Sequence, residues 1–381
     1  MNGRRSGPTR RSGAAGALGA GLLATAAGAG HVLYPATLWW LTRNRPRQGR
    51  RTITDWPGVT VLVAAYRESG VIGAKVADVE ANGYQGDLEV IVVAEDAGTA
   101  DTARAAGARV IEPPERLGKA QALNVGMRAA RHPVVVISDA NNSLGHGSIA
   151  SLVQRMEDPR VGAVAGRKIE ADGGGEELYW RFESWVNDRA ARLGTTIGIA
   201  GELVAVRADA WCDIPEDVSS DDLWLALDLA ERGFSVAYEP SARSIEPPVE
   251  SGEHQWERRT RISSGALYVF WRKRALLRPG HGVVTLEIIG HKLWRSTVGP
   301  LAHLTLLGWA AVRARHSPVA ALLLAGHAVG AGAAVHRQRG GRVPKLLAAP
   351  AQVLYLQAVA IGGMVRFLRG DRVLKWTKAH R

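Results

Sequence analysis

Short apolar segments rich in β-branched residues alternate with longer helical patterns through the first part of the chain. The apolar segments cover residues 59–65, 88–93, 108–111 and 134–137, and each interval between them has room for a helix. Strands that alternate with helices in this way form right-handed βαβ units and a mostly parallel sheet. We therefore expect an α/β fold for a globular region at residues 54–280, with its ligand at the carboxyl ends of the strands.

The segment 134–143, VVVISDANNS, combines an apolar half with a cluster of short polar side chains. The apolar half predicts a buried strand that delivers Asp139 and Asn141 to its carboxyl end. Residues two apart in an extended segment point to the same face, so these side chains can hold one divalent cation between the protein and a diphosphate. The alternative is structural, because Asp and Asn also shape turns and cap helices.

The formal net charge of +12 is compatible with nucleic acid, anionic lipid or a phosphate-bearing substrate. Basic residues gather at 4–11, 43–51, 258–274 and 366–381, each group beside an apolar segment. This distribution predicts contact with membrane lipids and no nucleic-acid partner. The single cysteine, Cys212, excludes an internal disulfide framework and a multi-cysteine metal site, and we expect it to be a buried thiol.

An apolar segment at residues 13–42 precedes the globular region and contains no Asp, Glu, Lys or Arg. It ends in Trp39 and Trp40 next to the basic Arg43, which is typical of a transmembrane helix. Residues 1–12 are rich in Gly, Ser and Arg and predict a disordered basic N-terminus. A cleaved signal peptide is the alternative for the apolar segment.

The chain returns to apolar sequence after the globular region. Residues 283–296 mix apolar side chains with His, Lys and Arg, as in an amphipathic helix that lies in a membrane interface. Residues 298–365 hold three apolar segments separated by basic residues, which predicts two or three transmembrane helices. Residues 366–381 form a basic tail, and because every loop is positive the positive-inside rule fixes no orientation.

A series of motifs follows the predicted strands in order. AAYRES follows the first strand, EDAGTADT the second, LGKAQALNVG precedes the strand at 134–137, and SDANN ends it. YWRFESW, GIAGELVAVR, SSDDLWLALDLAERGFSVAYEP and ERRTRI come later in the chain. Over residues 59–294 these motifs resemble the membrane-bound, inverting family 2 glycosyltransferases, which build polysaccharide or glycolipid from nucleotide sugars. The resemblance implies a glycosyltransferase-A type nucleotide-binding domain with a mostly parallel sheet, flanked by transmembrane helices.

The same resemblance implies an enzyme that moves a hexosyl or N-acetylhexosaminyl group from a nucleotide-diphosphate sugar, a UDP-sugar, to a polysaccharide or lipid-linked acceptor. Donor supply would place it in the cell membrane as a multi-pass protein with its catalytic domain facing the cytoplasm. Processive relatives carry a Q-x-x-R-W motif that this chain lacks, which favours the addition of one or a few sugars. The alternative is a non-catalytic membrane scaffold that retains the fold.

The resemblance also assigns the donor site. The turn after the first strand and the end of the second would receive the base and ribose, while basic residues and a metal ion, Mg²⁺ or Mn²⁺, would face the diphosphate. Asn141 replaces a second aspartate that is usual in the family, and an amide adds no negative charge, so we expect weaker metal binding. The implied donor residues are Ala65, Tyr66, Glu68, Asp96, Lys119, Asp139, Arg258 and Arg259, and the implied metal ligands are Asp139 and Asn141.

The acceptor side is assigned to two later motifs. Gly201 belongs to a loop of small residues that lets the acceptor approach the sugar, since glycine permits close approach to the backbone. Asp221 and Asp222 begin an amphipathic helix, and the family position makes Asp222 the general base, with Asp221 beside the acceptor. Two carboxylates at a helix start also fit simple capping, and we expect that setting to keep them ionised.

Overall fold

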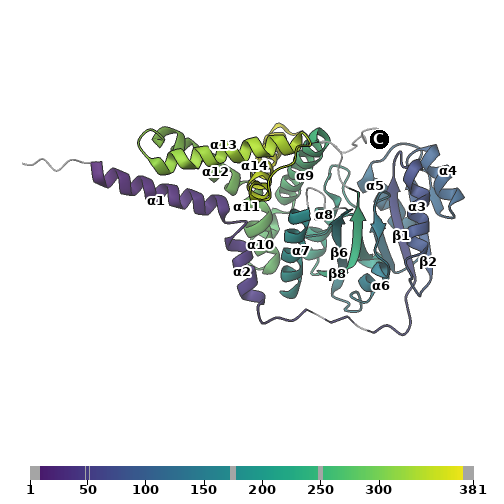
Figure 1. Cartoon of the computed structure of the whole chain (residues 1–381). Coiled ribbons are helices and arrows are strands. Elements are labelled where there is room, and N and C mark those ends of the chain that lie inside the picture. Colours follow the sequence, from purple (N-terminus) through teal and green to yellow (C-terminus); the bar gives the residue numbers. More distant parts are fainter. Residues whose placement is uncertain (1–8, 48, 51, 172–176, 248–251, 372–381) are drawn as a thin grey trace, which may run out of the picture.

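The computed structural model describes residues 9–47, 49–50, 52–171, 177–247 and 252–371. An eight-stranded sheet in the order β3-β2-β1-β4-β7-β6-β8-β5 forms its centre (Figure 1). The strands are β1 Val59–Ala65, β2 Leu88–Ala94, β3 Arg109–Ile111, β4 Val134–Ser138, β5 Ser143–Leu144, β6 Val161–Glu170, β7 Leu203–Arg207 and β8 Ser235–Glu246.

The expected parallel arrangement is confirmed in the first half of the sheet, where β3, β2, β1 and β4 all run parallel. The second half is mixed, because β7 runs antiparallel to both β4 and β6 whereas β6 and β8 are parallel. The β4–β7 register pairs Ser138 with Leu203. It therefore places Asp139, just after β4, beside Glu202, just before β7, at one edge of the sheet.

Helices cover both faces of this sheet (Figure 1). Alternate residues of β1 enter different cores: Leu62 packs with α5 and α8, while Val61 and Val63 pack with α3, α4 and α6. Buried strands of this kind give the polar residues at their ends fixed positions. The helices are α3 Ser69–Glu80, α4 Ala97–Ala105, α5 Lys119–Ala129, α6 Ser148–Val153, α7 Glu177–Arg192, α8 Asp221–Glu231 and α9 Gly252–Arg272.

The segment expected to form one transmembrane helix, residues 13–42, forms two helices instead, α1 Thr9–Gly28 and α2 Leu33–Thr42. The break follows from close packing on residues 294–295: Trp294 Nε1 donates to the Ala26 carbonyl at 2.7 Å, and a Cβ on Gly30 would lie 2.6 Å from Arg295 Cγ. Figure 1 shows α1 beside α12 and α2 turning away along α7 and α10. Of the predicted disordered N-terminus, residues 1–8 lie outside the described residues, and 9–12 belong to α1.

The carboxyl-terminal region is helical, as expected. Residues 283–296, called the interface segment below, form one continuous helical stretch built from α10 Val283–Glu287, a π-helical turn Ile288–Leu293 and α11 Trp294–Ser296. Three helices follow: α12 Val298–Arg313, α13 Pro318–Gln338 and α14 Lys345–Arg369. Among the described residues, α13 and α14 are long and apolar enough to cross a membrane. The 16 residues of α12 fall short of the roughly 20 that a bilayer requires.

The single cysteine does not fit the expectation of a buried thiol. Cys212 is exposed, in the irregular segment that follows the short 3₁₀ turn Ala208–Ala210. Its neighbours Asp213 and Glu216 are also exposed, so this polar connection stays at the surface and carries the thiol with it.

Candidate active site

Lys119 lies at the centre of the side chains that gather at the carboxyl edge of the parallel strands. It begins α5 directly after Gly118, whose φ of 86° suits glycine. Its Nζ lies 2.7 Å from Asp139 Oδ1 and 3.8 Å from Asp221 Oδ2. Burial alone would lower the pKa of Lys119, but the Asp139 and Asp221 carboxylates outweigh burial and raise it. Lys119 is therefore a fixed cation between the end of β4 and the start of α8.

Asp222 lies in the first turn of α8, where its Oδ1 accepts the N–H of Leu223 at 2.7 Å. Burial and the neighbouring Asp221 charge raise the pKa of Asp222 to about 6, against the opposing effects of the Leu223 bond and Lys119. Burial and a second carboxylate thus oppose the helix dipole at Asp222, and with a pKa of about 6 this carboxylate is still mostly ionised at neutral pH. A pKa close to the working pH suits a general base.

The donor chemistry of Asp139 and Asn141 decides whether they can hold a metal ion. Asp139 Oδ1 accepts a hydrogen bond from Lys119, and Oδ2 has no hydrogen-bond partner among the described residues. Asn141 is half-buried in the turn that follows. No group of three or more His, Cys, Asp or Glu side chains that could hold a metal occurs in the described part of the chain. One carboxylate and one amide fit a cation such as Mg²⁺ only when substrate phosphates complete the shell, as is usual for that ion.

Asn142, next to Asn141, is a residue that the sequence analysis missed. It is 5% exposed; its Oδ1 accepts from Lys75 Nζ at 2.8 Å, and its Nδ2 donates to the Glu202 carbonyl at 2.7 Å. These bonds tie the turn after Asp139 to α3 and to the start of β7. The signal in the sequence was the pair of consecutive Asn residues after a buried strand. One Asn is enough to shape a turn, so the second indicates a separate role.

The predicted base and ribose turn is held by hydrogen bonds. Asp96 Oδ2 accepts the N–H of Arg67 at 2.6 Å, and its Oδ1 accepts the N–H of Thr99 at 3.0 Å. Burial would raise the pKa of Asp96, but these backbone bonds lower it overall. Arg67 has a φ of 55°, a strained conformation for a non-glycine residue that often marks a functional turn. The structure therefore brings Asp96 to the turn that carries Tyr66 and Glu68, while Ala65 is buried at the end of β1.

Glu95, the residue before Asp96, supports the other side of the site. Its Oε1 accepts the N–H groups of Leu117 at 2.9 Å and Gly118 at 2.6 Å, directly before Lys119. The guanidinium of Arg116 lies 4.0 Å from the centre of the Tyr66 ring, which closes the loop over the donor turn. Adjacent carboxylates at the end of β2 therefore hold the two loops that flank the predicted donor site.

Gly201 lies beside the carboxylate pair, as the family position implies. A Cβ there would lie 3.5 Å from both Asp222 Cβ and Lys119 Nζ, which is ordinary van der Waals contact. Alanine would therefore fit at this position, and neither packing nor the backbone requires glycine there. The glycine that packing does require is Gly198, where a Cβ would lie 1.8 Å from Asn187 Oδ1.

A buried ion cluster that the sequence analysis also missed continues this edge. Lys168 of β6 bonds to the carboxylates of Glu202 and of Glu246, which ends β8, and its Nζ lies 4.6 Å from the centre of the Trp180 ring. Burial and the Glu202 charge raise the pKa of Glu246 to about 7. The negative charge of Glu202 also contributes to the raised pKa of Asp222. The cluster therefore belongs electrostatically to the site, although no short motif reveals it.

The basic motif ERRTRI lies on α9, and helical spacing separates its arginines. Arg258 is exposed near Glu202 and Glu246, and the guanidinium of Arg259 lies 5.0 Å from the centre of the Tyr179 ring. Arg261, one turn from Arg258, is the arginine whose pKa responds to the Asp221 and Asp222 charges, although burial lowers it. The resemblance assigned only Arg258 and Arg259 of this motif to the donor, although the i,i+3 spacing of Arg261 from Arg258 predicts a shared helix face.

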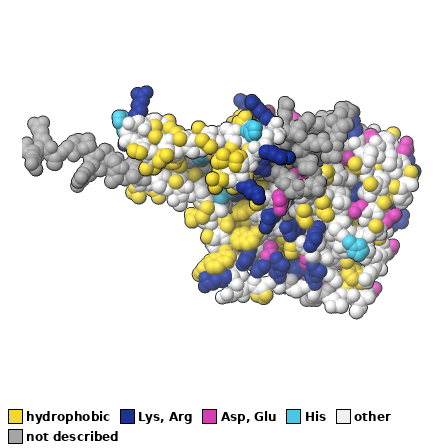
Figure 2. Space-filling view, in the orientation of Figure 1, with side chains coloured by type: hydrophobic (Ala, Val, Ile, Leu, Met, Phe, Trp, Pro, Cys, Tyr) yellow, Lys and Arg dark blue, Asp and Glu magenta, His cyan; other side chains and the backbone are white. Residues whose placement is uncertain are grey.

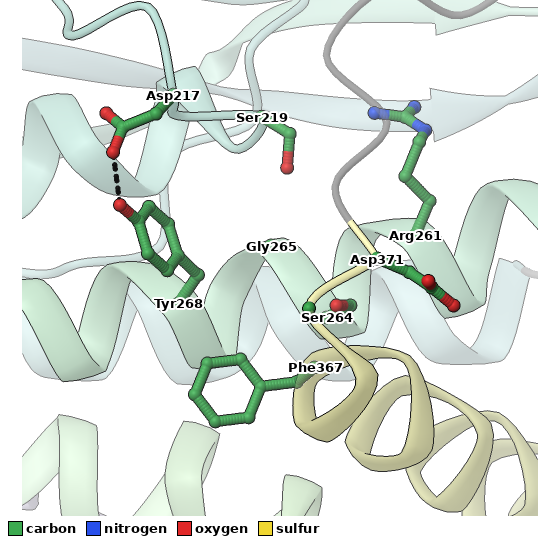
Figure 3. A pocket seen from close by; sticks show the side chains of 9 residues that line it. Asp217, Ser219, Arg261, Ser264, Gly265, Tyr268, Phe367 and Asp371 are labelled. Carbon is green, nitrogen blue, oxygen red and sulfur yellow. Dashed lines mark hydrogen bonds between the residues drawn. The ribbon is translucent and has the colours of Figure 1, made fainter.

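Arg261 also lines a small pocket of about 40 Å³ between α9, the start of α8 and the end of α14 (Figure 3). Tyr268 donates a hydrogen bond to Asp217 on one side of it, and Phe367 of α14 lies below Gly265. This volume suits a few water molecules, whereas ligand sites usually need about 300 Å³ or more. The edge around Lys119 is therefore the candidate donor site, and this pocket is not.

Comparison with known proteins agrees with this geometry. A family model described as glycosyltransferase-like family 2 matches residues 57–266. The poly-beta-1,6-N-acetyl-D-glucosamine synthase of Staphylococcus aureus strain MSSA476 is 24% identical over 238 residues, which are 58% of this chain and 57% of that protein. An N-acetylglucosaminyltransferase of Rhizobium sp. strain N33 is 25% identical over 218 residues, 50% of this chain and 48% of that protein. The chain spans about half the length of these curated relatives.

Among solved structures, the mannosyltransferase PcManGT from Pyrobaculum calidifontis, in complex with GDP-Man and Mn²⁺, has a similar fold. The TM-score is 0.73 at 26% identity, and the match covers 93% of this chain and 99% of that chain. The similarity therefore extends beyond the sheet to the helices on both sides of it.

Proposed function

Because this chain belongs to glycosyltransferase-like family 2, we propose that it transfers a hexosyl or N-acetylhexosaminyl group from a UDP-sugar to a glycan or lipid-linked acceptor. The observation that carries the proposal is the position of Lys119, 2.7 Å from the Asp139 carboxylate and 3.8 Å from the Asp221 carboxylate. One cation there can face the diphosphate while the Asp221-Asp222 pair faces the acceptor. N-acetylglucosamine transfer by the curated relatives supports this sugar class, and the GDP-Man bound to the solved neighbour makes a GDP-sugar the competing donor.

The proposed reaction is a direct displacement that inverts the anomeric carbon. Asp222 takes the proton of an acceptor hydroxyl, and that oxygen forms a bond to the anomeric carbon as the bond to the diphosphate oxygen breaks. The bonding electrons leave with the nucleoside diphosphate, whose charge is offset by Lys119, Arg258 and Arg259. Mg²⁺ or Mn²⁺, held by Asp139 and Asn141, would add positive charge at the diphosphate. Ala65, Tyr66, Glu68 and Asp96 would hold the base and ribose, and Gly201 would leave room for the acceptor.

We further propose a multi-pass location in the cell membrane, with the sheet domain facing the cytoplasm where nucleotide sugars are made. The length and apolar composition of α13 and α14 support membrane attachment. α1 pairs laterally with α12 in Figure 1, and we expect this pair to lie beside α13 and α14 at the membrane, where α12 is too short to cross on its own.

The test is turnover of donors by the purified protein in detergent. We expect release of nucleoside diphosphate from UDP-sugars, with an increase when a sugar-hydroxyl acceptor is added, and little release from GDP-Man. Preference for GDP-Man would support the transferase activity but show that the donor nucleotide is GDP instead of UDP. No turnover of any nucleotide sugar, with nucleotide binding retained, would instead support the membrane scaffold that keeps the fold without the reaction.

A further inference from the structure

An apolar groove of about 700 Å³ lies between α2 and the interface segment. It is on the far side of α7 from the sheet (Figure 1), and none of the active-site residues described above lines it. Its volume falls within the range of about 300–1,000 Å³ that is typical of small-molecule sites. Residues that form its walls include Leu33, Tyr34, Thr37, Leu277, Leu286 and Ile289.

The outer rim of this groove has the composition of a membrane-contacting surface. Leu33, Trp39 and Trp40 on α2 are 51%, 52% and 58% exposed, and Ile289 on the interface segment is 40% exposed. Figure 2 shows hydrophobic side chains gathered over α2 and α10, with Lys and Arg side chains at the lower end of the patch. The guanidinium of Arg43 lies 5.3 Å from the centre of the Trp40 ring. Exposed tryptophan beside arginine is typical of a helix that lies at the lipid–water boundary.

The groove offers hydrocarbon contact and little hydrogen bonding. The Thr285 hydroxyl donates to the Leu276 carbonyl at 2.7 Å, and Trp294 Nε1 donates to the Ala26 carbonyl at 2.7 Å. These two polar groups of the lining are bonded within the protein, and the buried Tyr34 hydroxyl is the lining group with no hydrogen-bond partner among the described residues. A ligand that fills such a groove is stabilised by burial of apolar surface, which favours an alkyl chain over a sugar or a nucleotide.

A buried polar cluster packs against one wall of the groove. Behind the groove, the Tyr34 ring stacks on His291 with centroids 5.3 Å apart, and His291 Nε2 lies 3.3 Å from Glu183 Oε2. Glu183 also accepts from Lys292 Nζ at 2.7 Å and from Arg295 at 2.7 Å. These charged groups lie on the inner side of Tyr34, and the groove lining contains neither Asp221 nor Asp222, so an occupant of the groove would not contact that pair.

We propose that this groove binds one acyl chain of a bilayer phospholipid. The chain would lie between α2 and the interface segment, with its headgroup at the basic rim. The two elements that would flank this acyl chain are in direct contact at Gly290, where a Cβ would lie 2.6 Å from Tyr34 Cδ2. The acyl chain would add further contacts between them. The proposal concerns a lipid site of the full chain and is independent of which sugar is transferred.

The experiment uses the full chain in phosphatidylcholine vesicles that contain phosphatidylcholine with a photoreactive diazirine in its acyl chain. After irradiation, we expect labelled peptides from residues 33–37 and 286–294. Thr37→Trp places an indole in the groove and should reduce labelling of 286–294 several-fold. Thr305→Trp is the matched control, since Thr305 is an exposed threonine of α12 outside the groove, and should leave that labelling unchanged.

Three outcomes would overturn the proposal. Labelling of 286–294 that Thr37→Trp does not reduce, or labelling confined to α12, α13 and α14, would show ordinary contact with surrounding lipid. Displacement of the label by an excess of an isoprenyl phosphate would assign the groove to a lipid-linked acceptor instead. If Thr37→Trp does not fold, as judged by its unfolding temperature in detergent, Ile289→Trp fills the same groove from the opposite wall and is tested in its place.

Discussion

Glu287 of the interface segment accepts the backbone N–H of Ile197 at 2.9 Å, so a residue close to the carboxyl-terminal helices in sequence holds the loop that leads to the candidate active site. Its other oxygen accepts the Thr196 hydroxyl at 3.0 Å. Glu287 is fully buried, and burial raises its pKa to about 7. The loop ends at Gly201, beside Asp222. Glu287 is therefore a positioning residue for the acceptor side, although it touches no part of the predicted donor site.

Glu287→Gln tests this role. Gln presents an amide nitrogen to one of the two donors, so one buried hydrogen bond is lost, at a cost of about 1–3 kcal/mol in the free energy of unfolding. We expect the KM for the acceptor to rise several-fold while the KM for the donor stays close to that of the parent. Glu183→Gln is the control, because Glu183 bonds the interface segment but not the loop. Equal changes in both variants would reduce Glu287 to a general stability role.

Replacement of Glu202 is expected to move the pH profile. Asp222 must be ionised to accept a proton, so transfer should rise with pH through the Asp222 pKa of about 6. The charge of Glu202 contributes to raising that pKa, and Glu202→Gln removes this charge and leaves Lys168 nearby. Loss of the Glu202 charge lowers the pKa of Asp222, so the acidic limb of kcat/KM against pH should move to lower pH. A limb that stays in place would show that Glu202 acts only on structure.

The first half of the fold was predictable from sequence because each strand there is a continuous apolar run and is followed by its own helix. The four predicted strands are confirmed, and the glycosyltransferase-A type fold is confirmed by the sheet and by the similarity to the solved mannosyltransferase. The mixed half of the sheet was not predicted. The chain places α7 between β6 and β7 and α8 between β7 and β8, and strand direction there depends on tertiary packing.

The candidate site was predictable where one motif supplies the residue, as for Lys119, Asp139 and Asp222. It was not predictable where residues distant in sequence share a bond, as in Lys168 with Glu202 and Glu246. The break between α1 and α2 also escaped prediction, because an apolar run with small residues reads as one helix until its contact with Arg295 is known.

We expect sugar transfer to depend on a divalent metal ion held by the Asp139 carboxylate and the Asn141 amide. We expect excess EDTA to abolish transfer and Mg²⁺ or Mn²⁺ to restore it. Asn141→Asp adds a negative charge at the predicted ion, so it should lower the metal concentration needed for half-maximal turnover several-fold. Asn142→Asp, one residue further along, is the contrast, since Asn142 is buried in structural hydrogen bonds and its change should reduce stability instead. Unchanged turnover in EDTA would rule out the metal role.

Membrane attachment predicts a defined extraction behaviour. The apolar helices α13 and α14 would make the protein resist carbonate and high salt and dissolve only in detergent. The measurement is the fraction of protein that remains with membranes after each wash. Release by salt alone would mean that these helices do not cross the bilayer and that the basic surface provides the attachment.

The most direct test of catalysis is Asp222→Asn. A sugar hydroxyl is a poor nucleophile at neutral pH, and a positioned base typically contributes about 10²–10⁴-fold in rate. Asn keeps the shape of Asp222 and can still accept the Leu223 N–H, but it cannot take up the acceptor proton. We therefore expect the variant to fold, extract and bind nucleotide like the parent while transfer falls by about 10²-fold or more.

Asp221→Asn is the matched variant one residue away. It keeps Asp222 intact and removes the negative charge that raises the Asp222 pKa, so transfer should fall less and its acidic limb should move to lower pH. Nucleotide affinity, measured by calorimetry, separates loss of chemistry from loss of binding in both variants. Transfer by Asp222→Asn at close to the parental rate would show that this carboxylate only supports the helix start. The base would then be sought among the other buried carboxylates along this edge of the sheet, of which Glu246 has a pKa raised to about 7.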